Sequence, residues 1–295
     1  MANFTKGHEG LKNAFVLTPT SLEDPVLFNS QEGLETIHTY GGVPKEELLS
    51  HVLRIRDEAW SKHTFPCIGM LSFLDFGISK LSVYPEILSR VKAGESLIDF
   101  GTFFGQDLRR LAADGAPTEN LYATDIEGLF WELGYDQFRD AGRFKAIFIE
   151  ADALDTSRET SPLLSDPRLL GKLSIIHSGH FLHLFPKEDT LKIICDVFLP
   201  LLNLEQPGAL IVGRNAGLKE AKLVKTLVQP QSTRVSNPLE SFSHNGETWK
   251  QLWEEVGEKT GTKWDIQINQ IDLDGYGKGA GFVQVSFACK YLGRA

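Results

Sequence analysis

Short apolar runs alternate with amphipathic stretches from about Gly94 onward, and this alternation predicts a parallel sheet whose strands are connected by helices. The runs are rich in Leu, Phe and β-branched residues without strict polar alternation, as expected of strands covered on both faces. The pattern predicts five such strands, over residues 96–100, 121–125, 145–150, 173–177 and 209–213.

Helical periodicity is clearest in two segments. The first lies between Pro186, which can start a helix, and Pro200, which can end it, and it spaces four apolar residues at i, i+3, i+4 and i+7: Leu191, Ile194, Cys195 and Phe198. The second repeats this spacing over residues 249–256, and Thr248 and Gln251 are spaced as a capping box at its start. Both helices are expected to pack their apolar faces on the sheet.

The end of the chain has a different pattern, in which two strand-like runs follow each other without a helix between them. Residues 263–273 and 281–292 are separated by the glycine-rich segment 274–279, which predicts an antiparallel hairpin. Five parallel strands with such a hairpin have the arrangement of the Rossmann-like class I methyltransferase fold. The sequence therefore predicts an α/β protein with a mostly parallel seven-stranded sheet, whereas a dehydrogenase Rossmann domain would continue with another helix and parallel strand.

Residues 1–90 differ from the rest of the chain, with a polar, glycine-containing start and a helical pattern over residues 44–62. We expect them to form an N-terminal helical cap or lid over the ligand crevice, within the same domain as the cofactor-binding core at residues 91–295. With 42% hydrophobic and 23% charged residues, the 295-residue chain has the composition of a globular protein.

The overall charge narrows the range of partners. A formal net charge of -9 would repel a phosphate backbone, and no run of Lys or Arg offers a local exception, so nucleic acid is not an expected partner. The sequence has no leader-like start and no window of 18 uncharged apolar residues, which predicts a cytoplasmic protein that does not enter the membrane. The cysteines are widely separated in apolar surroundings, which predicts buried thiols rather than disulfides or a zinc site: Cys67, Cys195 and Cys289.

The strongest local signal is the segment 97–108, LIDFGTFFGQDL, in which a strand runs into a glycine-punctuated turn and then a helix. Gly101 allows a close backbone approach, and the helix that begins near Gly105 aims free N–H groups at an anionic group such as a methionine carboxylate. Asp99 can accept a hydrogen bond from an ammonium. Phe103 replaces the middle glycine of a dinucleotide fingerprint, and a tight turn without a ligand explains this segment equally well.

Two further acids follow the next two strands. Asp125 comes 24 residues after Gly101, where Rossmann-like sites place the acid that binds ribose hydroxyls. Asp152 could accept from an adenine amino group, with Ile126 and Leu154 on either side of the base. One such acid alone is commonly a helix N-cap, but acids at the ends of three successive strands meet at one edge of a parallel sheet, where ligands bind.

The stretch 84–152, especially IDFGTFFGQDLRRLAADGAPTENLYATDI and LGYDQFRD, resembles fungal class I methyltransferases of secondary metabolism, in particular those that methylate carboxylic acids in meroterpenoid pathways. The likeness continues in four later segments and covers about two thirds of the chain: 181–185, 213–214, 243–245 and 252–257. It implies S-adenosylmethionine as cofactor and a small organic molecule as substrate. Thr102 departs from the family, which often has Cys there. The predicted cofactor-binding residues are Asp99, Gly101, Thr102, Gly105, Asp125, Ile126, Asp152 and Ala153.

Histidines gather after the fourth predicted strand, where His177, His180 and His183 follow each other at three-residue spacing. No carboxylate or thiol joins them and this spacing does not bring three rings to one point, so no metal site is predicted. Which of the three faces the substrate is left open. Arg214, just past the fifth strand, can hold a carboxylate in a bidentate fork or form a surface ion pair. The predicted catalytic residues are His180, His244 and Arg214.

Methyl transfer from a sulfonium is an in-line displacement in which positioning supplies much of the catalysis. An ionised carboxylic acid needs no general base, whereas a phenol or alcohol would, and the sequence leaves this choice open. Three other functions remain as alternatives: a cyclisation or rearrangement on the same fold and cofactor, a non-catalytic binding module, and a nicotinamide dehydrogenase. Phe103 and the terminal hairpin argue against the dehydrogenase. The oligomeric state is open, with a homodimer as one option.

Overall fold

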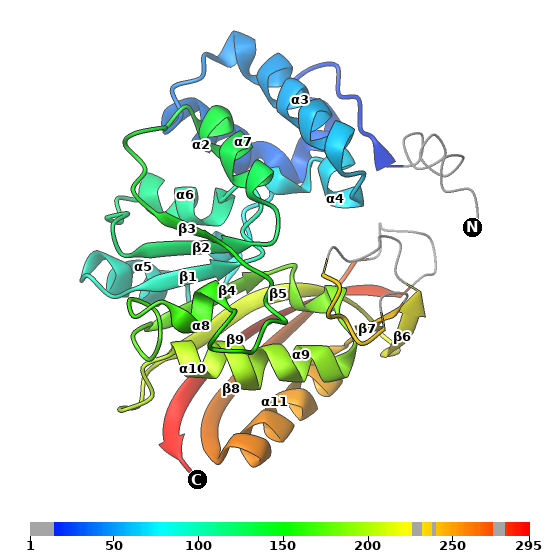
Figure 1. Cartoon of the computed structure of the whole chain (residues 1–295). Helices are drawn as coiled ribbons and strands as arrows, with labels where there is room; N and C mark the ends of the chain where they lie inside the picture. The colour runs from blue at the N-terminus through cyan, green and yellow to red at the C-terminus, as the bar shows by residue number, and fades with distance from the viewer. Residues whose placement is uncertain (1–14, 226–231, 238–239, 274–280) are drawn as a thin grey trace. The chain divides into compact units, whose positions relative to one another are not determined.

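The computed structural model describes residues 15–225, 232–237, 240–273 and 281–295 (Figure 1). The chain forms two compact units, each made of several stretches of sequence. The first unit comprises residues 1–76, 103–115 and 127–145, and the second comprises residues 77–102, 116–126 and 146–295. No helix in the described ranges is both long and apolar enough to cross a membrane.

The first unit is helical. Its helices are α2 (Gln31–Thr39), α3 (Lys45–Lys62), α4 (Pro66–Gly69), α6 (Gln106–Ala113) and α7 (Gly128–Phe138). The helix predicted over residues 44–62 is confirmed as α3, with Pro44 as its N-cap. The core of this unit combines apolar side chains of α2 and α3 with Phe104, Phe130 and Phe138, so the N-terminal helices do not build a core from residues 1–90 alone. Their role as a cap or lid stays a prediction.

A buried ion pair connects the two later stretches of the first unit. Arg109 of α6 donates from Nε to Asp140 Oδ2 at 2.9 Å and from Nη2 to Oδ1 at 3.1 Å, and neither side chain reaches solvent. The guanidinium also donates to the Phe104 carbonyl and lies 4.4 Å from the centroid of the Phe144 ring. Tyr40 donates its hydroxyl to Asp140 Oδ2 at 3.1 Å. This network holds α6, α7 and the end of α2 together.

The second unit contains a seven-stranded sheet in the order β3-β2-β1-β4-β5-β9-β8. Its strands are β1 (Leu97–Phe100), β2 (Leu121–Asp125), β3 (Ile147–Glu150), β4 (Ile175–Gly179), β5 (Leu210–Leu218), β8 (Thr262–Asp272) and β9 (Phe282–Arg294). Strands β1 to β5 pair in parallel, and β9 is antiparallel to both β5 and β8. The predicted class I methyltransferase fold is therefore confirmed. The predicted turn at 274–279 lies outside the described residues.

The strand ends differ from the predicted ones in places. The third strand begins at Ile147 rather than at residue 145, and the fourth begins at Ile175, because Leu173 instead forms an isolated bridge with Leu202. The fifth strand continues beyond residue 213 to Leu218, since β9 pairs with it along its whole length. Partners that are distant in sequence thus set these boundaries.

Helices cover both faces of this sheet. On one face lie α9 (Lys187–Ile193), which continues through a π-helical turn (Ile194–Phe198) into α10 (Leu199–Leu201), and α11 (Gly246–Thr260) (Figure 1). Their apolar residues share one core with Ile98, Ile176 and Ile211, which lie side by side in register. On the other face lies α5 (Tyr84–Lys92), tied to β9 by an ion pair between Glu86 and Lys290.

Two local predictions about these helices are wrong. Pro200 does not end the first helix, which includes it and stops after Leu201, beyond the π-helical turn. The capping box of α11 pairs Asn245 with Thr248, not Thr248 with Gln251, because the helix begins at Gly246. The structure also contains a short hairpin of β6 (Lys222–Lys225) and β7 (Glu240–Ser243), which the pattern did not predict.

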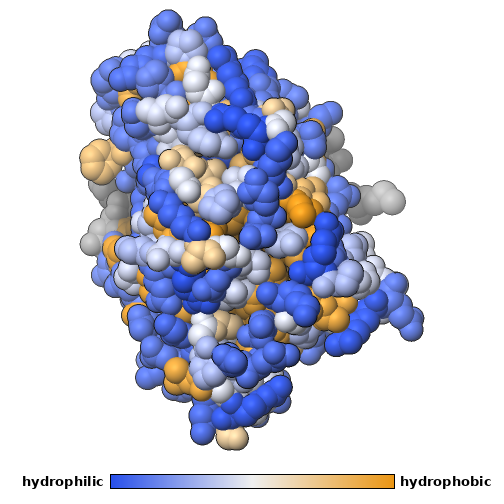
Figure 2. Space-filling view, turned by 90° about the vertical axis from the view of Figure 1, so that its left-hand side faces the viewer, coloured by the Kyte–Doolittle hydropathy of each residue, from blue (hydrophilic) through white to orange (hydrophobic). Residues whose placement is uncertain are grey.

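The surface drawn in Figure 2 is mostly hydrophilic, with smaller apolar areas between the polar ones. The large apolar side chains with high exposure belong to separate elements, among them Phe28, Leu223 and Leu292. Apolar residues scattered in this way are usual on globular proteins.

Candidate active site

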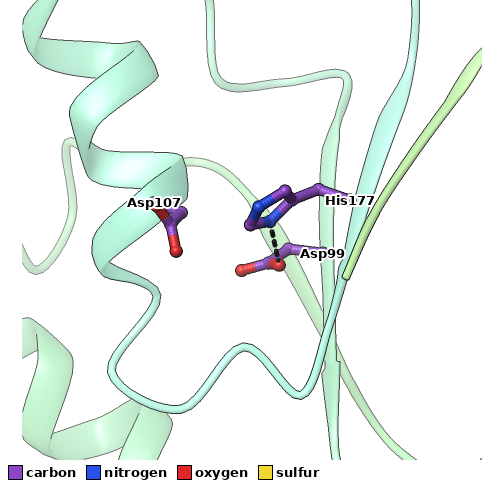
Figure 3. A group of neighbouring side chains, drawn as sticks. All are labelled: Asp99, Asp107 and His177. Carbon is purple, nitrogen blue, oxygen red and sulfur yellow. Dashed lines mark hydrogen bonds and ion pairs between the residues drawn. The ribbon is translucent and has the colours of Figure 1, made fainter. Parts of the chain in front are cut away.

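The turn after β1 is organised around the buried carboxylate of Asp99. Its Oδ1 accepts from Nδ1 of the His177 ring on β4 at 2.7 Å, as Figure 3 shows, and its Oδ2 accepts from the Thr102 hydroxyl at 2.8 Å. Asp107, also drawn in Figure 3, belongs to α6 of the first unit. Both oxygens of Asp99 are therefore engaged within the second unit, and a ligand ammonium would have to share them.

Two glycines of the predicted turn adopt the left-handed conformation. Gly101 has φ +67°, and a Cβ there would lie 2.6 Å from Cδ2 of Phe181, which follows β4. Gly105, in the first unit, has φ +64° directly before α6, and a Cβ there would meet Nη1 of Arg109 at 2.6 Å. The sequence predicted that Gly101 lets a ligand come close to the backbone. In the structure, the left-handed conformation and the contact with Phe181 already require glycine at this position, with or without a ligand.

Alanine at Gly101 is expected to destabilise the protein more than alanine at Gly94. Both glycines have left-handed φ, +67° and +95°, so the conformation alone costs about 1–2 kcal/mol at either position. A Cβ at Gly94 would meet nothing within 4 Å, whereas one at Gly101 would overlap Phe181. Gly101→Ala should therefore lose about 1–3 kcal/mol more in urea unfolding. Equal losses in the two variants would contradict this account of the turn.

The ends of β2 and β3 carry the next two predicted acids. Asp125 is half-buried at the end of β2, its carbonyl accepts from the Ala151 amide at 2.9 Å, and the neighbouring Ile126 is exposed. Asp152 follows β3, and Ala153 beside it is buried. Because β1, β2 and β3 are adjacent and parallel, Asp99, Asp125 and Asp152 lie along one edge of the sheet, as predicted.

Asp152 has partners that the sequence did not reveal. Its Oδ2 accepts from the Ser232 hydroxyl at 2.7 Å and from Nη1 of Arg234 at 3.1 Å, while Oδ1 accepts from the Leu154 amide at 3.0 Å. The segment that supplies these partners is anchored further where Ser236 donates to Asp189 of α9. An adenine amino group at Asp152 would have to share or displace these bonds.

The end of β4 brings His180 next to Arg214. His180 has φ +51°, unusual for a residue with a side chain, and its amide donates to the Arg214 carbonyl at 2.7 Å. His180 is an exposed residue, but the protein around its ring and then the Arg214 charge hold its pKa well below the usual value. The His183 ring lies 5.7 Å away. Arg214 itself is buried, and a Cβ on Gly77 would lie 2.7 Å from its Nε.

His244 lies on the other face of the sheet from Arg214. Arg214 alternates with Gly213 and Asn215 along β5, so its side chain leaves on the face that carries α5. A Cβ on Gly217, which faces the opposite way, would collide with the His244 carbonyl. His244 is buried there, with Nδ1 3.2 Å from the Thr248 hydroxyl. The structure thus places His180 with Arg214 and separates His244 from the Arg214 guanidinium by the plane of the sheet.

Acid is expected to destabilise the protein partly through His244, because burial lowers its pKa from 6.5 to about 4. The unfolded chain binds more protons between these pH values, so the stability that neutral His244 provides above pH 6.5 is lost as the pH falls toward 4. His244→Phe should reduce the fall in unfolding free energy over this range by about 1–3 kcal/mol. Urea unfolding at several pH values measures this free energy. If it falls by the same amount in His244→Phe as in the wild type, the lowered pKa of His244 is contradicted.

The sequence has relatives among fungal enzymes. Residues 27–74 match a family model described as the meroterpenoid methyltransferase N-terminal domain. The chain is 39% identical over 246 residues to the asnovolin E/chermesin D methyltransferase of Aspergillus novofumigatus, covering 82% of this chain and 83% of that one. It is 37% identical over 260 residues to methyltransferase adrK of Penicillium roqueforti, covering 87% and 86%. It is 32% identical over 240 residues to O-methyltransferase phiE of a fungal species, covering 80% and 74%.

Solved structures resemble the chain more distantly. A DhpI–SAH complex has a TM-score of 0.44 at 13% identity, covering 83% of this chain and 97% of that chain. A Haemonchus contortus N-methyltransferase complex has a TM-score of 0.46 at 13% identity, covering 71% and 52%. At these TM-scores the likeness adds nothing to the fold assignment, which rests on the strand order of the second unit.

Proposed function

The chain belongs to the fungal meroterpenoid methyltransferases, and we propose that it transfers a methyl group from S-adenosylmethionine to a carboxylate oxygen of a small apolar metabolite. One observation carries the proposal for the cofactor. Asp99, Asp125 and Asp152 lie at the carboxyl ends of three adjacent parallel strands, in a sheet with the strand order of a class I methyltransferase. Open α/β sheets bind their ligands at this edge.

The residues at this edge contact different parts of the cofactor. Asp125 accepts from both ribose hydroxyls, since a carboxylate has enough lone pairs to accept two hydrogen bonds at once. The exposed Ile126 and the buried Ala153 give the adenine apolar contact through their side chains, and Asp152 accepts from its amino group. The Asp99–Thr102 hydrogen bond fixes the turn beside the methionine part, with Gly101 at its centre. When bound, the sulfonium supplies an activated methyl group.

The acceptor carboxylate is held by Arg214, whose guanidinium is buried within reach of the solvent-accessible His180. A planar guanidinium fixes a carboxylate in two parallel hydrogen bonds, which orients one oxygen for an in-line displacement. The carboxylate is already ionised at neutral pH, so His180 contacts the acceptor without having to remove a proton. The cytoplasmic location and the oligomeric state remain predictions.

The test uses deuteromethyl-labelled S-adenosylmethionine and a panel of terpenoid and polyketide carboxylic acids. Asnovolin E and chermesin D are tested beside the panel, because the Aspergillus novofumigatus relative is named for them. Mass spectrometry should show a labelled methyl ester that mild alkaline hydrolysis removes. A label that survives this hydrolysis would indicate a phenol or alcohol acceptor. A product without added mass would indicate a cyclisation or rearrangement.

A further inference from the structure

Several buried polar atoms near the ends of β4 and β5 lack a hydrogen-bond partner in the described part of the chain. They are Oγ of Ser178, both amide atoms of Asn215, Nε2 of His244 and Nδ1 of His183. The Ser178, Asn215 and His244 side chains are 0%, 2% and 4% exposed. Buried polar groups nearly always have a partner, and leaving one without costs free energy. We call these four residues the Asn215 cluster.

Three members of the cluster, Ser178, Asn215 and His244, lie on one face of the sheet. Ser178 pairs in register with Gly213, so the Ser178 side chain and that of Asn215, two residues along β5, leave on the same face. Gly217, two residues further, faces the His244 carbonyl on that face. Asn215 thus lies between the serine and the histidine. This face is the one that α9 and α11 cover.

The cluster carries no charge at neutral pH. Burial lowers the pKa of both His183 and His244 to about 4, and Ser178 and Asn215 are neutral. Asn215 acts on the His183 ring and raises its pKa against the larger effect of burial, yet the two side chains make no hydrogen bond of normal geometry. A neutral set of donors and acceptors suits a neutral oxygen better than a second carboxylate.

Strand β4 ends beside the cluster. Strand β4 ends at Gly179, which pairs with Arg214, so from Asn215 onward β5 has no sheet neighbour on that side among the described residues. Arg214 and Asn215 are consecutive, and their side chains leave on opposite faces. A ligand at the end of β4 would therefore lie beside the stretch of β5 that carries both residues.

We propose that the Asn215 cluster binds a neutral oxygen of the acceptor, a hydroxyl or carbonyl group remote from the carboxylate that is methylated. The inference rests on the proposed function, because that function places the acceptor at the ends of β4 and β5. The Asn215 amide donates to this oxygen, and the serine and histidine side chains complete its hydrogen bonds. The cluster thereby selects oxygenated acids over purely hydrocarbon ones.

The test compares two tricyclic terpenoid acids that differ by one hydroxyl, podocarpic acid and its 12-deoxy derivative. Their affinities are measured by calorimetry with S-adenosylhomocysteine saturating. The wild type should bind podocarpic acid about tenfold more tightly, since an analogue without the hydroxyl leaves the cluster unpaired. Asn215→Leu should bring the ratio close to one and leave the Kd of S-adenosylhomocysteine unchanged. Its Tm is measured alongside, to confirm that the variant folds.

Trp253→Phe is the matched control, because it removes another buried N–H without a partner. Trp253 lies on α11 and packs against Trp264 of β8. This variant should keep the wild-type ratio. If Asn215→Leu fails to fold, Asn215→Ala replaces it. A wild type that binds both acids equally, or neither, while S-adenosylhomocysteine binds normally, overturns only this inference. An Asn215→Leu variant that keeps the wild-type ratio of affinities for the two acids also overturns this inference. Absence of S-adenosylhomocysteine binding overturns the proposed function itself.

Discussion

Replacing Asp140 by alanine is expected to lower the free energy of unfolding by about 3–5 kcal/mol, since it leaves the Arg109 guanidinium buried without its counter-charge. The surrounding rings of Trp131 and Phe144 cannot replace two charge-assisted hydrogen bonds. Urea unfolding followed by circular dichroism measures the loss. The variant should also lose the Tyr40 hydrogen bond, which adds to the effect.

Asp136→Ala, in the last turn of α7, is the matched control, because Asp140 follows the same helix. Asp136 pairs with Arg54 at 2.7 Å, but the two side chains are 46% and 50% exposed, so the loss should stay below about 1 kcal/mol. Similar losses of unfolding free energy in Asp140→Ala and Asp136→Ala would contradict the prediction that the buried Arg109–Asp140 pair stabilises the protein more than the exposed pair.

Arg214→Ala is expected to lower kcat/KM for the acceptor acid by about a hundredfold to a thousandfold, or about 3–4 kcal/mol. Under the proposed function, the variant would lose the two parallel hydrogen bonds that orient the carboxylate, so KM should rise and kcat should fall together. Arg214→Lys should recover only part of the rate, because a point charge does not reproduce the planar fork. Steady-state kinetics measure this on whichever acid the labelling assay identifies, with Tm confirming that the variants fold.

His180→Ala separates orientation from base catalysis. If Arg214 orients an ionised acid, this variant should lose less than about tenfold in kcat/KM. A hundredfold loss in His180→Ala with Arg214→Ala nearly unaffected would contradict the carboxylate assignment and indicate a phenol or alcohol acceptor. The pH profile alone does not separate the two, because the lowered pKa keeps His180 neutral at pH 6.5 and above in either case.

The central strands β1, β2, β4 and β5 were predictable because they are buried runs, and a buried strand needs apolar residues on both faces. The position of Asp125 and Asp152 at one edge follows from topology alone, since parallel strands end together. The sequence could not predict contacts between residues that are far apart along the chain. Nothing near Asp152 indicates that Ser232 and Arg234, about 80 residues later, bond to its carboxylate.

The grouping of the predicted catalytic residues depended on side-chain direction. The order of strands places Arg214 and His180 together, and the structure has them hydrogen-bonded through the backbone. The separation of His244 follows from which face of β5 each residue occupies, and pairing with β9 sets that register. Asn215 was not predicted, because nothing in the sequence distinguishes this asparagine from others. Only the structure shows that its amide is buried without a hydrogen-bond partner.

The central claim, a cofactor site at the ends of β1, β2 and β3, is tested most directly by calorimetric titration with S-adenosylhomocysteine. The wild type should bind it, and Asp125→Ala should bind about tenfold to a hundredfold more weakly, because two ribose hydroxyls lose their acceptor at about 1–3 kcal/mol. Folded wild-type protein that gives no binding signal, or an Asp125→Ala variant with unchanged affinity, would contradict the account.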